Sequence, residues 1–533
     1  MAKTNIGLVF CPGWSIDAPP LALATLAAYV RGQTRHTAAC FDLNSRFYRA
    51  AGRFQTYWDN LRLSILFWLD EGSVERFIRE NGNLVEGCVR EILASPCRVL
   101  GFSVCNSQAL FALALARRIK AADPSRIIIF GGPECDRHIS GPAFARESAV
   151  DGVVMGEGEA VLGPLLDGVS ETGLLPAIPG LLLNLGGGRI QDCGPAAPCR
   201  DLDQLPFADY SDFSAQWAAG EYRAAGDLWL FTSRGCLGHC HFCQQCLLCG
   251  GFRTKSAERI FAEIKHLAQQ LPGIKKIFFS DLLINGDLQV LERLCDLLLA
   301  ARLQLKWGGH AVVSPRMSEA LLRKMAAAGC SFLWLGLESG SERVRRLMNK
   351  NPFTNDEAAG FLQRGARAGI ELQGNFMFGM PGETRGDFSE TLAFLTRVKP
   401  WLHSVAESNR LCAIYPETYL YSHAGDLGIL HADSILFWEM ADGSNGYLER
   451  LRRSEEFTRL ARSLGIPSCS RGLPFPKWLY LGDYFSFKGD RRLAGLCYRR
   501  SRRYESLPEL ADRKLAGLSG AGPAPGSLPG HGK

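Results

Sequence analysis

The chain has 533 residues, of which 47% are apolar and 21% charged, and its formal net charge is +6. This composition is typical of a globular protein of two or three domains, because one hydrophobic core seldom organises a chain of this length. No apolar run is long enough to span a membrane and no secretory signal pattern opens the sequence, so we expect a cytoplasmic protein. Basic residues are dispersed except at 491–505, where the pattern predicts a solvated helix face and no nucleic-acid partner.

Apolar runs alternate with helical stretches between residues 6 and 165, from IGLVF and LALATLAAYVR through RVLGFSV and ALFALALARRIK to RIIIF. Glycine-rich turns such as GGPE follow the strands, which is typical of a parallel, doubly wound sheet. The sequence therefore predicts an α/β fold with an N-terminal Rossmann-like domain over residues 1–165. Ligands of such sheets bind beyond the carboxyl ends of the strands, so the loops after Phe10, Val104 and Phe130 form a candidate site.

The remaining chain divides into four segments. Residues 166–222 are rich in Gly, Pro and Asp, and we expect a connector with one hairpin. Strand–helix units then repeat over 223–418, which predicts a partial (β/α)6, TIM-like barrel with helices at Ala257–Gln270, Leu288–Ala301 and 318–328. A mostly helical region is expected over 419–514 and a disordered tail over 515–533.

Eighteen cysteines is a high count, and five of them lie in and just after the segment TSRGCLGHCHFCQQC. Cys236, Cys240 and Cys243 have C-x3-C-x2-C spacing directly after a predicted strand. Three thiolates on one tight loop can ligate three irons of a [4Fe–4S] cluster, whereas ordinary electron-transfer clusters take four cysteines. A zinc ribbon needs two C-x2-C pairs about 15–20 residues apart, and the next cysteines lie too far along the chain.

With Phe242 before its third cysteine, this motif resembles the signature of the radical S-adenosylmethionine (SAM) superfamily. The resemblance implies that the three cysteines hold a [4Fe–4S] cluster whose open iron chelates the amino and carboxylate groups of SAM. It also implies that an electron from the cluster cleaves SAM to methionine and a 5'-deoxyadenosyl radical. The alternative is a zinc site or a set of buried thiols.

Cys246 and Cys249 extend the run at further x2 spacings and depart from the superfamily pattern. Two cysteines cannot complete a cubane, so we interpret them as packed or bystander thiols. An auxiliary cluster or thiol chemistry on the substrate is the alternative.

Segments further along the chain resemble other parts of radical SAM enzymes. GFRTKSAERIFAEI resembles the segment after the cysteine loop, and Ser256 is a candidate N-cap of its helix. Polar residues at the ends of the second and fourth predicted strands, and glycines after the fifth, match positions that contact SAM in relatives, although the usual GGE motif is absent. The resemblance thereby assigns to SAM Phe242, Asp281, Asn285, Glu338, Ser339, Gly379 and Gly382. His310, after the third strand, is either a packed residue or a substrate contact.

The first 165 residues resemble the cobalamin-binding domain that precedes the radical domain in one large subclass, through APPLALATLAAYVR, GFSVCNSQALFALALARRIK, FGGPE and VVMGEGEAVL. Gly131 and Gly132 would let a large planar ligand approach the strand ends closely. Asn106 and Ser107 are candidate hydrogen-bonding partners of its nucleotide tail. The cobalt-ligating motif D-x-H-x-x-G is absent, and an empty scaffold is the alternative to bound cobalamin.

The sequence thus predicts a radical SAM enzyme with a [4Fe–4S] cluster, SAM and cobalamin, most simply a methyltransferase acting on an unactivated carbon or phosphorus centre. Cobalamin-dependent rearrangement or cyclisation is one alternative, and a non-enzymatic iron–sulfur redox sensor is another. The expected partners are a small-molecule or peptide substrate and an electron donor such as flavodoxin or ferredoxin. Aromatic side chains of the C-terminal region are candidates for shaping the substrate pocket, namely Trp438, Tyr447, Trp478, Tyr480 and Tyr484.

Overall fold

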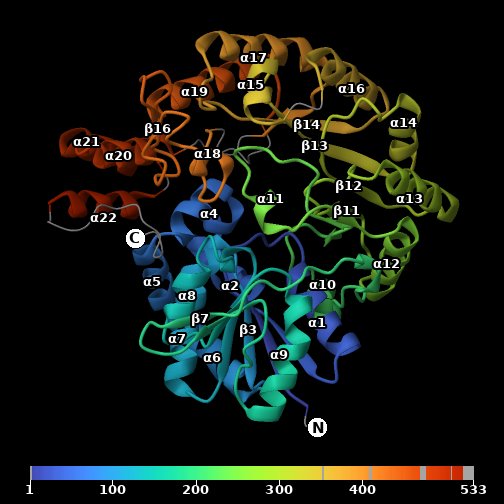
Figure 1. The fold of residues 1–533 in the computed structure, drawn as a ribbon, viewed down its shortest axis with the longest axis vertical. Coiled ribbons are helices and arrows are strands. Elements are labelled where there is room, and N and C mark those ends of the chain that lie inside the picture. The colour runs from blue at the N-terminus through green and yellow to red at the C-terminus, as the bar shows by residue number, and fades with distance from the viewer. Residues whose placement is uncertain (1–2, 351–352, 407–410, 469–475, 506, 520–533) are drawn as a thin grey trace.

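The computed structural model describes residues 3–350, 353–406, 411–468, 476–505 and 507–519, without the side chains of residues 61, 62, 246, 247 and 519. It has two α/β units, one above the other in Figure 1, and a helical C-terminal region beside them. None of the described helices is long and apolar enough to cross a membrane.

The first unit is built on a seven-stranded sheet of order β2-β1-β3-β4-β5-β6-β7. The first five strands pair in parallel, and β6 and β7 add an antiparallel hairpin. The strands are β1 (Asn5–Phe10), β2 (Thr37–Asp42), β3 (Val99–Ser103), β4 (Ile127–Gly131), β5 (Gly152–Val154), β6 (Leu181–Asn184) and β7 (Ile190–Asp192). The strand order reverses between β1 and β3, which is the switch point where doubly wound sheets bind ligands.

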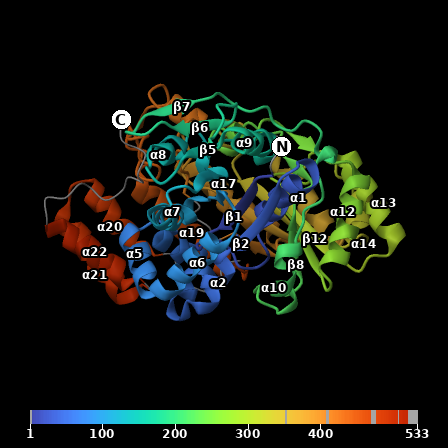
Figure 2. The ribbon, with the colours of Figure 1, turned by 90° about the horizontal axis from the view of Figure 1, so that it is seen from below.

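Helices cover both faces of this sheet (Figure 2), as its hydrophobic runs require. The helices that connect its strands are α1 (Leu21–Gln33), α7 (Ala109–Ala122), α8 (Gly141–Arg146) and α9 (Gly158–Thr172). A helical insertion between β2 and β3 comprises α2 (Leu43–Ala50), a 3-10 turn (Gly52–Gln55), α3 (Thr56–Asp59), α4 (Leu61–Trp68), α5 (Glu71–Glu80) and α6 (Gly82–Ala94). Its aromatic side chains, including Trp58, Phe67 and Phe77, join the core on one face of the sheet.

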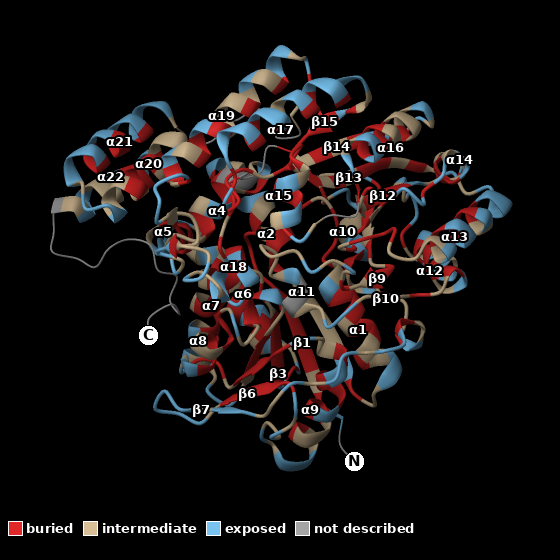
Figure 3. Ribbon diagram, turned by 45° about the horizontal axis from the view of Figure 1, so that its top comes forward, coloured by how far each residue is buried: buried red, intermediate tan, exposed pale blue. Residues whose placement is uncertain are grey.

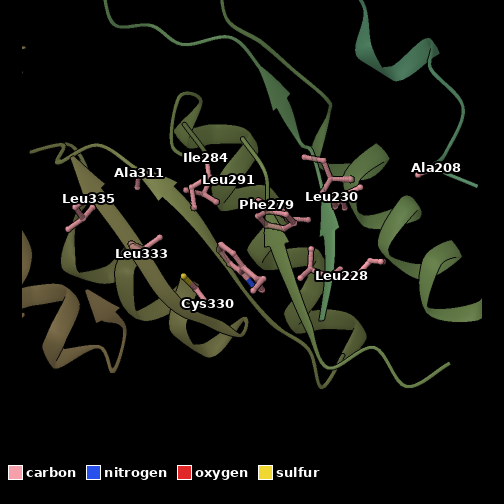
Figure 4. Close-up of a cluster of buried hydrophobic side chains, with 14 of the residues drawn as sticks. Ala208, Leu228, Leu230, Phe279, Ile284, Leu291, Ala311, Cys330, Leu333 and Leu335 are labelled. Atoms are coloured by element: carbon pink, nitrogen blue, oxygen red, sulfur yellow. The ribbon is translucent and has the colours of Figure 1, made fainter. Parts of the chain in front are cut away.

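The second unit is a partial barrel of six parallel strands in the order β15-β14-β13-β12-β11-β8. These are β8 (Asp227–Leu230), β11 (Lys276–Phe279), β12 (Lys306–Ala311), β13 (Cys330–Glu338), β14 (Glu371–Phe376) and β15 (Ser404–Val405). The helices around it are α12 (Ala257–Gln270), α13 (Leu288–Ala301), α14 (Glu319–Ala327), α15 (Glu342–Leu347), α16 (Asn355–Arg367) and α17 (Arg385–Val398). Alternate strand residues form the core beneath these helices, as Figure 4 shows for Leu228, Phe279 and Leu333.

The C-terminal region contains α18 (Tyr419–Ser422), the short hairpin β16 (Ile429–Leu430) and β17 (Glu439–Met440), α19 (Tyr447–Ser463), α20 (Lys477–Phe487), α21 (Arg491–Tyr504) and α22 (Pro508–Ser519). Its last helices return to the first unit. Leu510 and Ala511 of α22 share a buried cluster with Leu63 of α4, and Arg513 pairs with Asp70. In Figure 3 much of α21 is exposed, and its buried residues lie on one face.

Most elements lie where the sequence predicts them. The helices expected at Ala257–Gln270 and Leu288–Ala301 have those bounds, and Ser256 caps the first by accepting a hydrogen bond from the Arg259 amide. The hairpin expected in the connector, β6–β7, is part of the first sheet. The tail expected from residue 515 begins inside α22, because Leu515 and Leu518 pack against the cluster around Leu510; residues 520–533 lie outside the described part.

Candidate functional site

A cavity of about 450 Å³ lies between the two units. One wall consists of the carboxyl ends of β1, β3, β4 and β5 and the loops after them, where the sequence predicts a site. The opposite wall comes from the barrel, through Trp229, Phe231, Arg234 and Ser280. A ligand over the first sheet would therefore contact the barrel strands that lead into the cysteine loop.

Two of the four residues expected to bind over the first sheet line this cavity. Gly131 and Gly132 do so, and a side chain at Gly132 would collide with the backbone of Val104. Asn106 and Ser107 are not in the wall. The Asn106 carboxamide oxygen accepts from the Ser107 amide, and the buried Ser107 hydroxyl donates to the Gly13 carbonyl oxygen at 2.7 Å.

The wall contains other residues that the sequence did not single out. Trp14, in the loop after β1, is 37% exposed beside the cavity, and the thiol of Cys105 lines it next to Ser103. Burial and the nearby Glu134 carboxylate raise the pKa of Cys105 to about 12, so its thiol is neutral at neutral pH. Only their positions after strand ends could have indicated these residues.

The cysteine loop runs from β9 (Ser233–Arg234) to α11 (Gln245–Leu248). Gly235 opens it with φ of 79°, and a Cβ there would lie 2.0 Å from the Gly251 carbonyl oxygen, so only glycine fits. Cys236 and Cys240 converge on Gly238, where an added Cβ would lie 3.6 Å from both sulfur atoms. The Gly238 amide also donates to the Cys236 sulfur at 3.3 Å.

Among the described residues, no group of three or more His, Cys, Asp or Glu side chains is arranged to hold one metal ion. A cubane places each cysteine on a different iron, whereas a zinc site brings all its ligands to one ion. Cys236 and Cys240, which both adjoin Gly238, and Cys243 on the same loop are the residues expected to hold the cluster. Cys249 is partly buried nearby, and the side chain of Cys246 lies outside the described part.

The far side of the loop is held by α15 and the segment after it. The His241 amide donates to the Met348 carbonyl oxygen at 2.9 Å, and its Nδ1 lies 2.8 Å from the Leu347 carbonyl oxygen. The imidazole stacks on Tyr419 with 3.8 Å between ring centroids. Phe242 packs against the apolar cluster that includes Met348. These contacts fix the loop, so Phe242 has a packing role in addition to the one expected from the sequence.

Glu338 ends β13 beside the cysteine loop, in a strained backbone conformation with φ of 58° and next to a register shift. Its carboxylate pairs with the Lys350 ammonium at 2.7 Å. Burial alone would lower the pKa of Lys350, but Glu338 and the Cys240 thiol raise it above its ordinary value. Burial raises the pKa of Cys240 to about 11, although Lys350 opposes this. A protonated amine thus lies beside both the Glu338 carboxylate and the cysteine loop.

The sequence did not single out Lys350, because it lies twelve positions beyond its partner Glu338 at the end of β13. Gly336 makes its position possible: a Cβ at Gly336 would lie 2.3 Å from the Lys350 nitrogen.

Asp281 and Asn285 are buried and form hydrogen bonds inside the protein. Asp281 accepts from the amides of Thr232 and Ser233 at 2.7 and 3.0 Å and from the Thr232 hydroxyl. Asn285 exchanges hydrogen bonds with the Val312 backbone. Burial raises the pKa of Asp281 to about 6, which its hydrogen bonds from Thr232 and Ser233 oppose. Asp281 therefore ties the end of β8 to the end of β11, directly before the cysteine loop.

The other residues expected to contact SAM also have internal partners. The Ser339 hydroxyl lies 3.0 Å from that of Thr391 and accepts from the Ser341 amide. Gly379 has φ of 84° and packs against the buried Arg450 side chain, whose guanidinium donates to three backbone carbonyl oxygens. Gly382 has φ of 80°, and a Cβ there would lie 3.5 Å from Leu347 Cδ1, an ordinary contact. Position 379 must therefore be glycine because the Arg450 side chain occupies the space of a Cβ. The sequence alone did not reveal this reason.

The comparisons agree with this arrangement. Residues 230–395 match the model of the radical SAM superfamily. The chain is 27% identical over 333 residues to an uncharacterised methyltransferase of Pyrococcus horikoshii, covering 61% of this chain and 69% of that protein. It is 29% identical to cytidylyl-2-hydroxyethylphosphonate methyltransferase of Streptomyces wedmorensis over 34% of this chain and 35% of that enzyme.

The fold is similar to that of a radical SAM methyltransferase, TsrM from Kitasatospora setae, whose structure contains cobalamin and a [4Fe–4S] cluster. The TM-score is 0.60 at 16% identity, and the match covers 97% of this chain and 100% of that one. At this identity the likeness concerns the fold, which confirms the predicted order of a Rossmann-like unit followed by a radical SAM barrel.

Replacing Asp281 by Asn tests its proposed role before the cysteine loop. An amide accepts through one oxygen only, so at least one donor of Thr232 or Ser233 loses its partner. We expect the free energy of unfolding to fall by about 1–3 kcal/mol and reconstituted protein to retain less iron. Asp296→Asn, on an exposed helix face, is the control. Wild-type stability and iron content in Asp281→Asn would contradict the role.

The two glycines after β14 form a matched pair. Both have positive φ, so either change to Ala costs about 1 kcal/mol in backbone strain. Gly379→Ala additionally places a methyl group 2.1 Å from Arg450 Cγ, whereas at Gly382 the nearest atom is 3.5 Å away. We expect denaturant unfolding to show a further loss of about 1–3 kcal/mol in Gly379→Ala. Equal losses in the two variants would mean that Arg450 moves aside without cost.

Proposed function

We propose that this chain, a radical SAM enzyme, is a cobalamin-dependent methyltransferase that acts on an unactivated carbon or phosphorus centre of a small molecule or peptide. The observation that carries the proposal is the cavity shared by the ends of the first sheet and the barrel strands beside the cysteine loop. A carrier of methyl groups over the first sheet and a radical source on the loop would act on one substrate between them. Proximity of this kind is what the protein contributes to cofactor chemistry.

The cysteine loop fits a [4Fe–4S] cluster with one open iron. Cys236, Cys240 and Cys243 would ligate three irons, and the amino and carboxylate groups of SAM would occupy the fourth. Lys350 is suited to the carboxylate, because its ammonium is buried and already neighbours Cys240. Glu338 balances that charge and can accept from a hydroxyl or amino group. Asp281 and Asn285 support the loop from behind.

The first unit fits cobalamin. Gly131 and Gly132 leave the strand ends free of side chains, and apolar aromatic groups such as Phe10 and Phe102 line the wall above the sheet. Trp14 lines the cavity and is partly exposed, so the tail of a large ligand could extend outward past it. When bound, cobalamin would supply methyl transfer and the cluster would supply the electron that cleaves SAM. The chain holds both reactants in place and restricts water through the apolar wall.

Two other functions fit part of the molecule. A cobalamin-dependent rearrangement or cyclisation would use the same cavity without delivering a methyl group. A redox sensor would need the cluster but neither the cavity nor the Lys350–Glu338 pair, and we therefore favour an enzyme. Either enzymatic reaction requires an external electron donor, for which a flavodoxin or ferredoxin is the natural class.

The three cysteines make the cluster assignment testable. We expect anaerobically reconstituted protein to bind about four irons, as a cubane requires, and Cys236→Ala, Cys240→Ala and Cys243→Ala each to lose the cluster absorption. The double variant Cys246→Ser/Cys249→Ser is the control and should keep its iron and its SAM cleavage. Intact cluster absorption in all three single variants would contradict the assignment of these cysteines as ligands. Loss of half the iron in the double variant would reveal a second cluster.

The products of SAM separate methyl transfer from the other uses of cobalamin. A methyltransferase consumes one SAM as methyl donor, giving S-adenosylhomocysteine, and a second as radical source, giving 5'-deoxyadenosine. We expect both S-adenosylhomocysteine and 5'-deoxyadenosine when the reconstituted chain is incubated with cobalamin, reductant and SAM. In Cys236→Ala we expect only S-adenosylhomocysteine. Deoxyadenosine without S-adenosylhomocysteine, from protein that carries cobalamin, would exclude the methyltransferase while keeping the radical enzyme.

A further inference from the structure

The interior of the barrel contains a layer of side chains with no role in the cofactor sites. Alternate residues of the parallel strands face the lumen, and the register aligns His310 with Trp334 and Trp334 with Gln373. Phe278, on β11, lies one level below, paired with Trp229 and Gly308. These residues form a continuous inner surface across five strands.

This inner surface is partly exposed. The outward residues of β13, Leu333 and Leu335, are fully buried, whereas the inward His310, Trp334 and Gln373 remain partly exposed. On the β8 and β11 side, Trp229, Phe231 and Ser280 line the cavity between the two units. Trp229 therefore belongs both to this cavity and, through its register with Phe278, to the inner surface of the barrel.

Aromatic rings form the walls. The Phe278 and Trp334 rings are 4.9 Å apart and tilted, and the His310 ring meets both edge-on at 5.8 and 5.1 Å. Below them, Phe332 stacks near Phe278. Such walls favour flat, apolar groups, because aromatic pairs add stabilisation beyond the area that they bury.

Two polar groups remain available on these walls. Neither ring nitrogen of His310 has a hydrogen-bond partner among the described residues, and burial lowers the pKa of His310, so its neutral ring can both donate and accept. Gln373 donates to the Asn375 carboxamide oxygen at 3.0 Å, and its own carbonyl oxygen receives no donor within the described chain. A ligand hydroxyl can both accept from His310 and donate to the Gln373 carbonyl oxygen, whereas a ring N–H can only donate.

The charges near the layer already face opposite charges. The Lys276 ammonium lies 4.4 Å from the centre of the Phe332 ring, and Lys276 is in register with Asp227, with which it interacts electrostatically. Above the layer, Lys350 is already paired with Glu338. No carboxylate or ammonium belongs to the layer of His310, Trp334 and Gln373 itself.

We propose that this layer is the substrate subsite and that it takes a neutral, planar aromatic ring, stacked against Trp334 and hydrogen-bonded by His310 and Gln373. The inference rests on the proposed function, since it places the acceptor of the reaction beside the cysteine loop. It makes the residues of the barrel lumen responsible for selecting the substrate class. The C-terminal aromatic residues, such as Trp478, then have a packing role.

Equilibrium dialysis of the reconstituted full-length chain tests the subsite with two probes of the same skeleton. 2-Naphthol is planar and aromatic, and decahydro-2-naphthol is its saturated counterpart with the same hydroxyl group. We expect 2-naphthol to bind about fivefold to tenfold more tightly. Trp334→Leu should abolish most of this preference. His310→Phe should weaken both probes by a similar factor and keep the preference, because both carry the hydroxyl group, whereas Trp478→Leu should change neither. Iron content and binding of S-adenosylhomocysteine, measured in parallel, show that each variant is folded.

Three outcomes would overturn the subsite. The probes could bind equally, Trp478→Leu alone could lose the preference, or the lumen variants could lose S-adenosylhomocysteine as well, which would assign the layer to SAM. His310→Phe keeps an aromatic ring, so it remains informative if Trp334→Leu fails to fold. Dialysis requires no methyl transfer, and failure of the proposed function would appear separately as missing S-adenosylhomocysteine in the product assay.

Discussion

The arrangement of the two units depends on one buried ionic contact, centred on Arg234. This residue directly precedes Gly235 and the first cluster cysteine, and its guanidinium reaches Glu159 at 2.6 Å and Glu157 at 3.1 Å. Glu157 caps the start of α9 and Glu159 lies in its first turn, and both residues line the cavity. The contact therefore connects the edge of the first sheet to the start of the cysteine loop.

A second arginine completes this contact. Arg253 pairs with Glu157 at 2.8 Å and donates to the carbonyl oxygens of Cys199 and Cys249. Burial would raise the pKa of Glu157, but Arg253 and Arg234 hold it below its ordinary value. Replacing one of these charged side chains would leave its partner as an unpaired buried charge. The cost of that unpaired charge exceeds the stabilisation that the intact pair provides. The distance between the two cofactor regions is therefore fixed by charge as well as by the shared core.

Local rules explain which parts of the fold could be predicted from the sequence. Helix starts were accessible because Ser256 and Ser318 cap their helices through their own side chains. The cysteine loop was accessible because three ligands must share one tight segment. Glu159 lies in the segment VVMGEGEAVL of the first unit, but its partner Arg234 lies 75 positions further along the chain. Pairings between units are set by the fold as a whole, and no local pattern reveals them.

The same distinction explains the polar residues expected at the cofactors. Ser107 and Asp281 follow strand ends, as binding residues do, yet buried backbone donors and acceptors must also find partners there. A serine that donates to the Gly13 carbonyl oxygen and an aspartate that accepts from Thr232 satisfy that need first. Residues with free polar groups, such as His310, were harder to assign from the sequence because a packed histidine would look the same.

Two glycines on the inner face of the strands, Gly336 and Gly308, divide the barrel interior into two regions. Gly336 leaves the space that the Lys350 ammonium occupies, so the upper lumen is charged and adjoins the cysteines. Gly308, one level below His310, leaves room for the Phe332 ring, so the floor is aromatic. The positions of these two glycines therefore set the boundary between the charged region and the aromatic region. A polar cofactor group and an apolar substrate can thus share one barrel, because each meets a surface of matching polarity.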